Sequence, residues 1–134
     1  MQEASKKAAN RKEAAVSFLK LAASGNLDEA YANYIGPNFR HHNPYFPGDA
    51  ESLKAGMAEA HAKFPDTTLE VQHVLEADDI VAVHSRVQHS SDTPAIAVVH
   101  IFRFEDDRVA ELWDIGQEEP KDSKRKRDIL SPPV

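Results

Sequence analysis

The chain has 134 residues, a length that suits one domain with a single hydrophobic core. Its net charge of −6 disfavours nucleic acid as a partner, because an acidic surface repels phosphate groups. The sequence contains no cysteine, which excludes disulfides, thiolate nucleophiles and zinc sites built on cysteine.

Signals of export and membrane insertion are also missing. The stretch MQEASKKAANRKEAA at the amino terminus is charged throughout and lacks the apolar run of a signal peptide. No stretch approaches the roughly 18 consecutive apolar residues that a membrane-spanning helix requires. These features predict a cytoplasmic protein without a membrane partner.

The first half of the chain has the pattern of three helices. Residues 3–24 are rich in Ala, Lys, Glu and Leu, and their apolar positions share one face. A second helix follows Asn26 and runs to about Tyr34, where a Gly-Pro pair ends it. Residues 38–49 form a short extended piece and a loop rich in proline and glycine. Residues 50–63 form the third helix.

The second half changes to the alternation typical of strands. The segment 94–104 is apolar on both faces, which predicts a strand at the centre of a sheet. The turns are short, so an antiparallel meander is expected from four strands, at 67–76, 79–89, 94–104 and 108–116. Three helices followed by such a sheet predict an α+β fold, with the helices on one face and an apolar pocket between the layers.

Two polar residues interrupt apolar faces of this sheet. His100 lies in a row of Ile, Val and Phe side chains, and Asp114 shares a face with Ala110, Leu112 and Gly116. Partial desolvation raises the pKa of a carboxyl group, which makes it a competent acid or base near neutral pH. The alternative is that Asp114 ends its strand and faces water, and the pattern alone leaves both open.

Other histidines are weaker candidates. His42 opens a loop, where a histidine serves either as a polar loop residue or as an acid–base group at a cavity mouth. Alternation places His84 on the more polar face of its strand, which suits a subunit interface, although a pocket with a polar lining would also accommodate it. Histidines 61, 73 and 89 have the pattern of surface residues on a helix, a strand and a turn.

No pattern indicates a metal or a cofactor. A metal site made from His42, His84, His100 and Asp114 is conceivable, but no HxxxH, HxH or HExxH spacing supports it. The chain also lacks a glycine-rich phosphate loop and a GxSxG nucleophile turn.

Three stretches resemble the SnoaL-like proteins of the nuclear-transport-factor-2-like superfamily: YIGPNFRHHNP at 34–44, DIVAVHSRV at 79–87 and AVVHIFRFEDDRVAELWDIGQ at 97–117. The similarity is strongest to the branch described as predicted SnoaL-like aldol-condensation enzymes. It implies a cone-shaped, curved antiparallel sheet that wraps a pocket under three helices, and a homodimer formed through the outer sheet face. Residues 1–117 would form this domain, and 118–134 a polar tail, mobile or draped on a partner subunit.

The resemblance also assigns roles. Asp114 matches the aspartate of the family's Glu-His-Trp-Asp stretch, the catalytic acid–base position of the cyclases. His42 and Asn43 match a His-Asn-Pro motif at the pocket mouth, and His84 matches a histidine typical of the branch. Two residues depart from the pattern, because His100 replaces a frequent aspartate and Leu112 a frequent histidine.

The functional hypothesis is proton transfer next to a carbonyl, without a cofactor, on a small apolar or carbonyl-bearing molecule. The reaction would be of the aldol-condensation, isomerase or dehydratase type. Asp114 would move the proton, and His100 or His84 would orient it or stabilise an enolate oxygen. Five residues are expected to shape the pocket: Tyr34, Tyr45, Phe64, Phe102 and Leu112. The alternatives are a non-catalytic, dimeric ligand-binding protein and a metal-assisted lyase or hydrolase.

Overall fold

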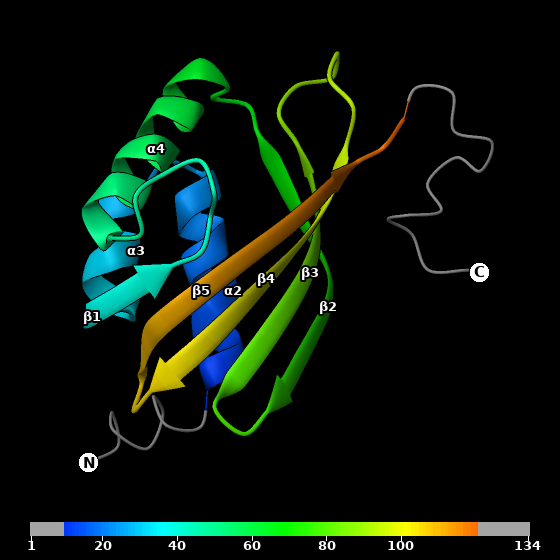
Figure 1. The fold of residues 1–134 in the computed structure, drawn as a ribbon. Helices are drawn as coiled ribbons and strands as arrows, with labels where there is room; N and C mark the ends of the chain where they lie inside the picture. The colour runs from blue at the N-terminus through cyan, green and yellow to red at the C-terminus, as the bar shows by residue number, and fades with distance from the viewer. Residues whose placement is uncertain (1–9, 121–134) are drawn as a thin grey trace.

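The computed structural model describes residues 10–120 and gathers three helices on one side of a curved sheet (Figure 1). The helices are α2 (Arg11–Ala23), α3 (Leu27–Tyr34) and α4 (Ala50–Lys63). The three helix predictions are confirmed, and α4 has the predicted bounds. The part of the first predicted helix that precedes residue 10 lies outside the described residues.

The sheet has five strands in the order β1-β5-β4-β3-β2. The predicted antiparallel meander is confirmed, and β4 is the central strand, as its two apolar faces predicted. The strands are β1 (Ile35–His41), β2 (Thr68–Ala77), β3 (Ile80–Gln88), β4 (Ile96–Glu105) and β5 (Arg108–Glu118). The fold is therefore α+β, with an open, curved sheet.

The edge strand β1 is the one element that the sequence did not predict as part of the sheet. It pairs with β5 in parallel, which makes the sheet mixed, and His41 lies beside Leu112 in the register. Pro37 is compatible with this strand because an edge strand leaves one side unpaired, where a missing N–H costs little. The strand leads the chain into the loop that precedes α4, next to the end of β5.

The hydrophobic core lies between α2 and the sheet face that we call the inner face, which carries Val83, Phe102 and Leu112. These three side chains are buried, and the ring of Phe18 on α2 meets that of Phe102 edge-on, with centroids 6.0 Å apart. The opposite sheet face, the outer face, carries His84 and Trp113. None of the helices in residues 10–120 is long and apolar enough to cross a membrane.

Arg11, at the start of α2, ties this end of the helix to two hairpin turns. Its guanidinium donates hydrogen bonds to the carbonyl oxygens of Asp106 (2.6 Å) and Asp78 (3.5 Å). Both aspartates have positive φ angles, 57° and 56°, which short turns between strands commonly require. These hydrogen bonds hold the start of α2 against the turns of the sheet, whereas the carboxyl-terminal end of α2 borders a cavity.

Candidate active site

A cavity of about 170 Å³ lies between the carboxyl-terminal halves of α2 and α4 and the inner face of the sheet. Its walls are mostly apolar and include Leu19, Ala22, Met57, Leu69 and Val87. Its polar lining consists of Thr67, His61, His89 and His100. An apolar pocket with a few convergent polar groups is the usual form of a small-molecule site.

A wider depression of about 370 Å³ lies at the opposite end of α2. Tyr34 and Arg108 line it, together with polar residues such as Glu13. It has neither His100 nor Asp114 in its walls, and Tyr34 is therefore separated from the predicted acid–base residues. The smaller cavity, with its half-buried imidazoles, is the stronger candidate for chemistry.

His100 lies on β4, with Val83 opposite it on one neighbouring strand and Asp114 on the other. One side of the ring contacts the cavity, whereas Nδ1 is shielded from solvent and has no hydrogen-bond partner within residues 10–120. Burial lowers the pKa of His100 to about 4, although the nearby Asp114 opposes this shift. The ring is therefore a neutral imidazole at neutral pH.

Asp114 lies directly across from His100 in the β4–β5 register and is only partly exposed. The side-chain amide of Asn43 donates to both of its carboxyl oxygens, at 3.0 and 3.3 Å. The orientation of this amide is determined because its Oδ1 accepts the backbone N–H of Tyr45 at 2.9 Å. Asp114 does not itself line the cavity but adjoins it through His100, and it is held by a partner rather than free at a strand end.

His41, which points to the inner side, stabilises the loop that carries Asn43. Its Nδ1 accepts the backbone N–H of Asn43 at 3.1 Å, so the neutral ring carries its hydrogen on Nε2 and donates it to the Pro47 carbonyl. Both ring nitrogens are thus occupied by the loop. His41 positions Asn43, and Asn43 positions Asp114.

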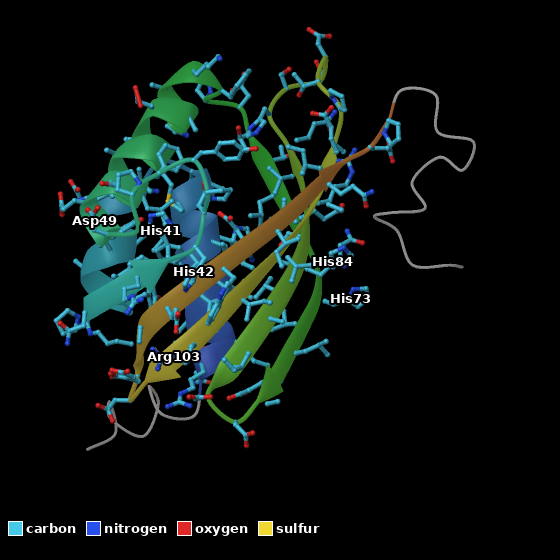
Figure 2. The ribbon with its side chains drawn as sticks, viewed as in Figure 1. His41, His42, Asp49, His73, His84 and Arg103 are labelled. Carbon is cyan, nitrogen blue, oxygen red and sulfur yellow. The ribbon has the colours of Figure 1, made fainter. Side chains whose placement is uncertain are left out.

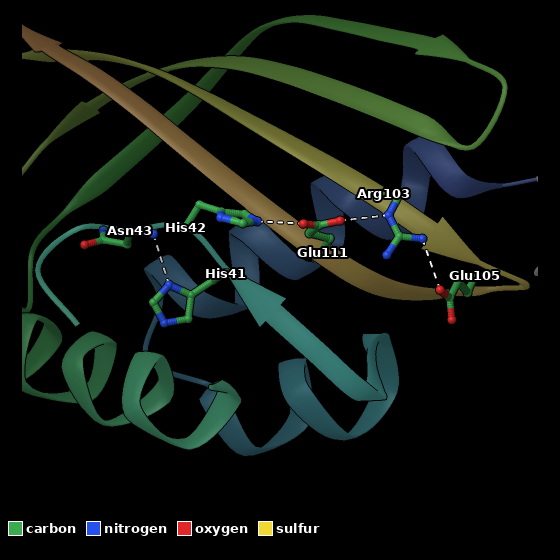
Figure 3. Close-up of polar contacts among 6 residues, drawn as sticks. All are labelled: His41, His42, Asn43, Arg103, Glu105 and Glu111. Carbon is green, nitrogen blue, oxygen red and sulfur yellow. Dashed lines mark hydrogen bonds and ion pairs between the residues drawn. The ribbon is translucent and has the colours of Figure 1, made fainter. Parts of the chain in front are cut away.

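His42 is not brought to the cavity, contrary to the expectation from the resemblance. Its ring stacks on Trp113, with centroids 4.8 Å apart, and Nε2 lies 2.6 Å from Glu111 Oε2. Glu111 also accepts from Arg103 at 2.9 Å, and Arg103 continues to Glu105, as Figure 3 shows. Hydrogen bonds from His42 and Arg103 lower the pKa of Glu111. This network belongs to the outer face.

His84 likewise lies on the outer face, and this corrects its expected role beside Asp114. It pairs with His73 across β2 and β3, with Nδ1 atoms 3.0 Å apart and nearly parallel rings, away from the helices (Figure 2). The strand separates it from His100, because neighbouring residues of the pleat point to opposite faces. Alternation had placed His84 on this face, whereas the family resemblance suggested the pocket.

The aromatic and aliphatic residues that were expected to shape the pocket have different environments. Phe102 and Leu112 belong to the core, with 0% and 1% of their surfaces exposed. Tyr45 is 85% exposed. Phe64 stacks on His89, with centroids 4.9 Å apart, and so supports one wall of the cavity.

Two cavity residues, His61 and His89, were predicted to be surface residues. Patterns in the sequence do point to them. His61 follows Met57 by four residues on the inner stripe of α4, and His89 continues the period-two row of Val83, Ser85 and Val87 on β3. A polar residue that continues an apolar row is therefore a useful signal of a cavity lining.

The metal site that was considered from the sequence is not assembled. His42 and His84 lie on the outer face, whereas His100 and Asp114 lie on the inner face, so these four side chains cannot share an ion. Within residues 10–120, no group of three or more His, Asp or Glu side chains is arranged to hold a metal.

Acid is expected to destabilise the protein through His100. The pKa of this residue is about 4 in the folded protein, below its ordinary value of 6.5, so the unfolded chain binds the extra proton between these two values. The free energy of unfolding should be fully retained above pH 6.5 and fall by about 3 kcal/mol as the pH decreases to 4. Urea unfolding across this pH range measures the loss.

The variant His100→Leu should lack this part of the pH dependence, because leucine cannot bind a proton. The outer-face variant His73→Leu is the matched control and should keep it. Identical pH profiles for the wild type and His100→Leu would contradict a neutral, buried His100.

Residues 15–112 match the family model of the SnoaL-like domain. No curated protein matches the chain. Among solved structures, AclR from Streptomyces galilaeus, a proposed hydroxylase, has a TM-score of 0.71 at 22% identity, covering 84% of this chain and 82% of AclR. Wild-type IdmH from Streptomyces antibioticus, a proposed polyketide cyclase, has a TM-score of 0.65 at 23% identity, covering 80% and 91%.

A protein of unknown function from Cytophaga hutchinsonii, described as like nuclear transport factor 2, has a TM-score of 0.65 at 14% identity, covering 81% of this chain and 90% of its own. At such low identities, these similarities establish a shared fold. They leave the activity to be argued from the side chains of the site.

Proposed function

The chain belongs to the SnoaL-like domain family, and from this premise we propose that it binds a small, carbonyl-bearing molecule in the 170 Å³ cavity and moves a proton next to the carbonyl. The observation that carries this proposal is the cross-strand pair of His100 and Asp114, one residue on the cavity wall and the other next to it on the same sheet face. No cofactor takes part in the proposed reaction.

The two residues suit different parts of such a reaction. Neutral His100 is suited to donate a hydrogen bond to the carbonyl oxygen, where negative charge develops as an enolate forms. Asp114 is suited to take the proton from the neighbouring carbon, and Asn43 holds its carboxyl group in place. Directly opposed residues of a sheet have Cβ atoms about 4.5–5.5 Å apart, so Asp114 adjoins His100, and the proposal requires the ligand to extend past His100 to this carboxylate.

Hydrogen–deuterium exchange tests this proposal without knowledge of the complete reaction. In D₂O, abstraction of a proton next to a ketone replaces that hydrogen with deuterium, which NMR detects directly. We expect the protein to accelerate this exchange in the methyl group of an aryl methyl ketone. A ketone that binds but exchanges only at the rate of buffer would favour the non-catalytic alternative.

A second candidate function is a non-catalytic, dimeric ligand-binding protein, which is favoured because Asp114 does not line the cavity, and the outer face bears on its dimeric state. Leu75 on β2 and Ile115 on β5 are 68% and 61% exposed there. Apolar residues link these two edges of the outer face in the cross-strand row Leu75, Ala82, Ile101 and Trp113. Apolar side chains gathered on one sheet face are typical of a protein interface. A homodimer through this face would be compatible with either function, because the cavity lies on the other side of the sheet.

The variant Ile115→Glu should convert this dimer to a monomer, because the interface would bury an unpaired carboxylate. Light scattering coupled to size-exclusion chromatography measures the mass. Tyr45→Glu is the control, because Tyr45 is an exposed aromatic residue outside the outer face. A wild-type protein that is monomeric at micromolar concentrations would rule out this interface.

A further inference from the structure

The volume of the cavity limits the size of its ligand. An apolar cavity of about 150 Å³ accommodates benzene, whereas sites for drug-sized molecules occupy about 300–1,000 Å³. At about 170 Å³, the present cavity has room for one six-membered ring with small substituents. Fused rings would have to extend out of it.

The lining of the cavity limits the charge of its ligand. It contains no Asp, Glu, Lys or Arg side chain, so a buried charged group would lack a permanently charged partner there. Transfer of an unpaired charge out of water is costly, whereas a neutral group needs only a hydrogen-bond partner. The cavity therefore favours a neutral molecule.

His89 offers an acceptor at one end of the cavity. The hydroxyl oxygen of Thr67 lies 2.8 Å from the carbonyl oxygen of Phe64, and only the hydroxyl has a hydrogen to place between them. Towards His89 Nδ1, at 3.1 Å, the same hydroxyl must therefore accept. In the neutral ring of His89 the hydrogen is thus on Nδ1, and Nε2 is left as an acceptor.

His100 and His61 provide the complementary groups. Nδ1 of each ring is shielded from solvent and has no hydrogen-bond partner among the described residues. The Cδ2–Nε2 edge of His61 lies against Gly25, where a Cβ atom would be only 2.5 Å away, so Nδ1 is on the other side of the ring. Because these shielded atoms do not face the cavity, the atom of His100 that a ligand can meet is Nε2, which also has no hydrogen-bond partner among the described residues.

From these constraints we infer that the ligand is a neutral single-ring molecule with two hydrogen-bonding groups, a hydroxyl that donates to His89 and a carbonyl that accepts from His100. A hydroxyaryl ketone has this chemistry. The inference takes the cavity as the binding site from the proposed function, but it does not depend on catalysis.

Calorimetric titration with four probes tests this ligand class. We expect 4′-hydroxyacetophenone to bind, and acetophenone, which lacks the hydroxyl, to bind about tenfold more weakly. The two-ring analogue 6-acetyl-2-naphthol and the anion 4-hydroxybenzoate should each bind more weakly than 4′-hydroxyacetophenone. Equal or tighter binding of either of these two, equal binding of acetophenone, or no binding of 4′-hydroxyacetophenone would overturn the inference.

The variant His89→Leu tests whether His89 is the hydrogen-bond partner of the ligand hydroxyl. This variant should bind 4′-hydroxyacetophenone only as tightly as acetophenone, and its affinity for acetophenone should equal that of the wild type. The outer-face control His73→Leu should change neither affinity. An unchanged preference for the hydroxylated ketone in His89→Leu would overturn the assignment, and thermal unfolding verifies that each variant is folded.

Measurements of ligand binding and of deuterium exchange distinguish a failure of this inference from a failure of the proposed function. Selective binding of 4′-hydroxyacetophenone without deuterium exchange would support the ligand class and contradict the catalytic proposal. Deuterium exchange of the two-ring ketone without binding of the single-ring ketone would support the catalytic proposal and contradict the ligand class.

Discussion

The Asp114→Asn variant should exchange the ketone hydrogen about 10²–10⁴-fold more slowly than the wild type, because it lacks the proposed base. The substitution keeps the size and shape of the side chain. One of the two contacts from the Asn43 amide can be retained, since asparagine still offers a carbonyl oxygen. We therefore expect the fold and the affinity for ketone to remain close to those of the wild type, with the loss confined to the rate.

Glu111→Gln is the matched control for this variant. Glu111 lies three residues earlier on β5 but on the outer face, where it accepts from His42 and Arg103. Its loss should disturb that network and leave the exchange rate unchanged. If Asp114→Asn retained the wild-type rate, or if Glu111→Gln lost it equally, Asp114 would not be the base.

The Phe102→Ala variant should reduce the free energy of unfolding by about 3–5 kcal/mol. The ring of Phe102 is fully buried, packs edge-on against Phe18 and lies next to the ring of His100. Truncation would leave a void under α2 that the surrounding side chains cannot fill completely. Urea or guanidinium unfolding at neutral pH measures this loss.

Tyr45→Ala is the comparison for Phe102→Ala, because both residues were expected to shape the pocket. With 85% of its surface exposed, Tyr45 should change the unfolding free energy by less than about 0.5 kcal/mol. A loss below about 1 kcal/mol in Phe102→Ala would instead indicate a ring that borders open space, as a pocket residue does.

Helices and strands were largely predictable because their causes are local. Helix α4 has the bounds that its apolar stripe and the flanking Pro-rich segments indicate, and β4 is central because both of its faces are apolar. The strand β1 was seen only as an extended piece, since its parallel partner β5 lies about 70 residues later in the chain. No local pattern identifies a partner at that distance.

The candidate site was predictable in part, for the same reason. Period-two alternation placed His100 and Asp114 on inner-facing rows, and the register makes them neighbours across the strands. Alternation also placed His84 on the outer face, where the structure has it beside His73. The resemblance suggested the pocket for His84 and for His42, and the side-chain contacts of this chain do not support either.

The sequence by itself thus determined the type of every element except β1 and the sheet face of most strand residues, because both depend on spacing along the chain. The irregularity between Val71 and His73 in β2 breaks this alternation. Only the tertiary structure decided how deeply each side chain is buried and which residues from distant segments lie close together. Phe102 shares the inner face with His100, yet Phe102 is fully buried against Phe18, whereas His100 borders the cavity. His61 reaches the same cavity because one part of α4 lines it together with α2 and the sheet, an arrangement set by contacts between distant segments.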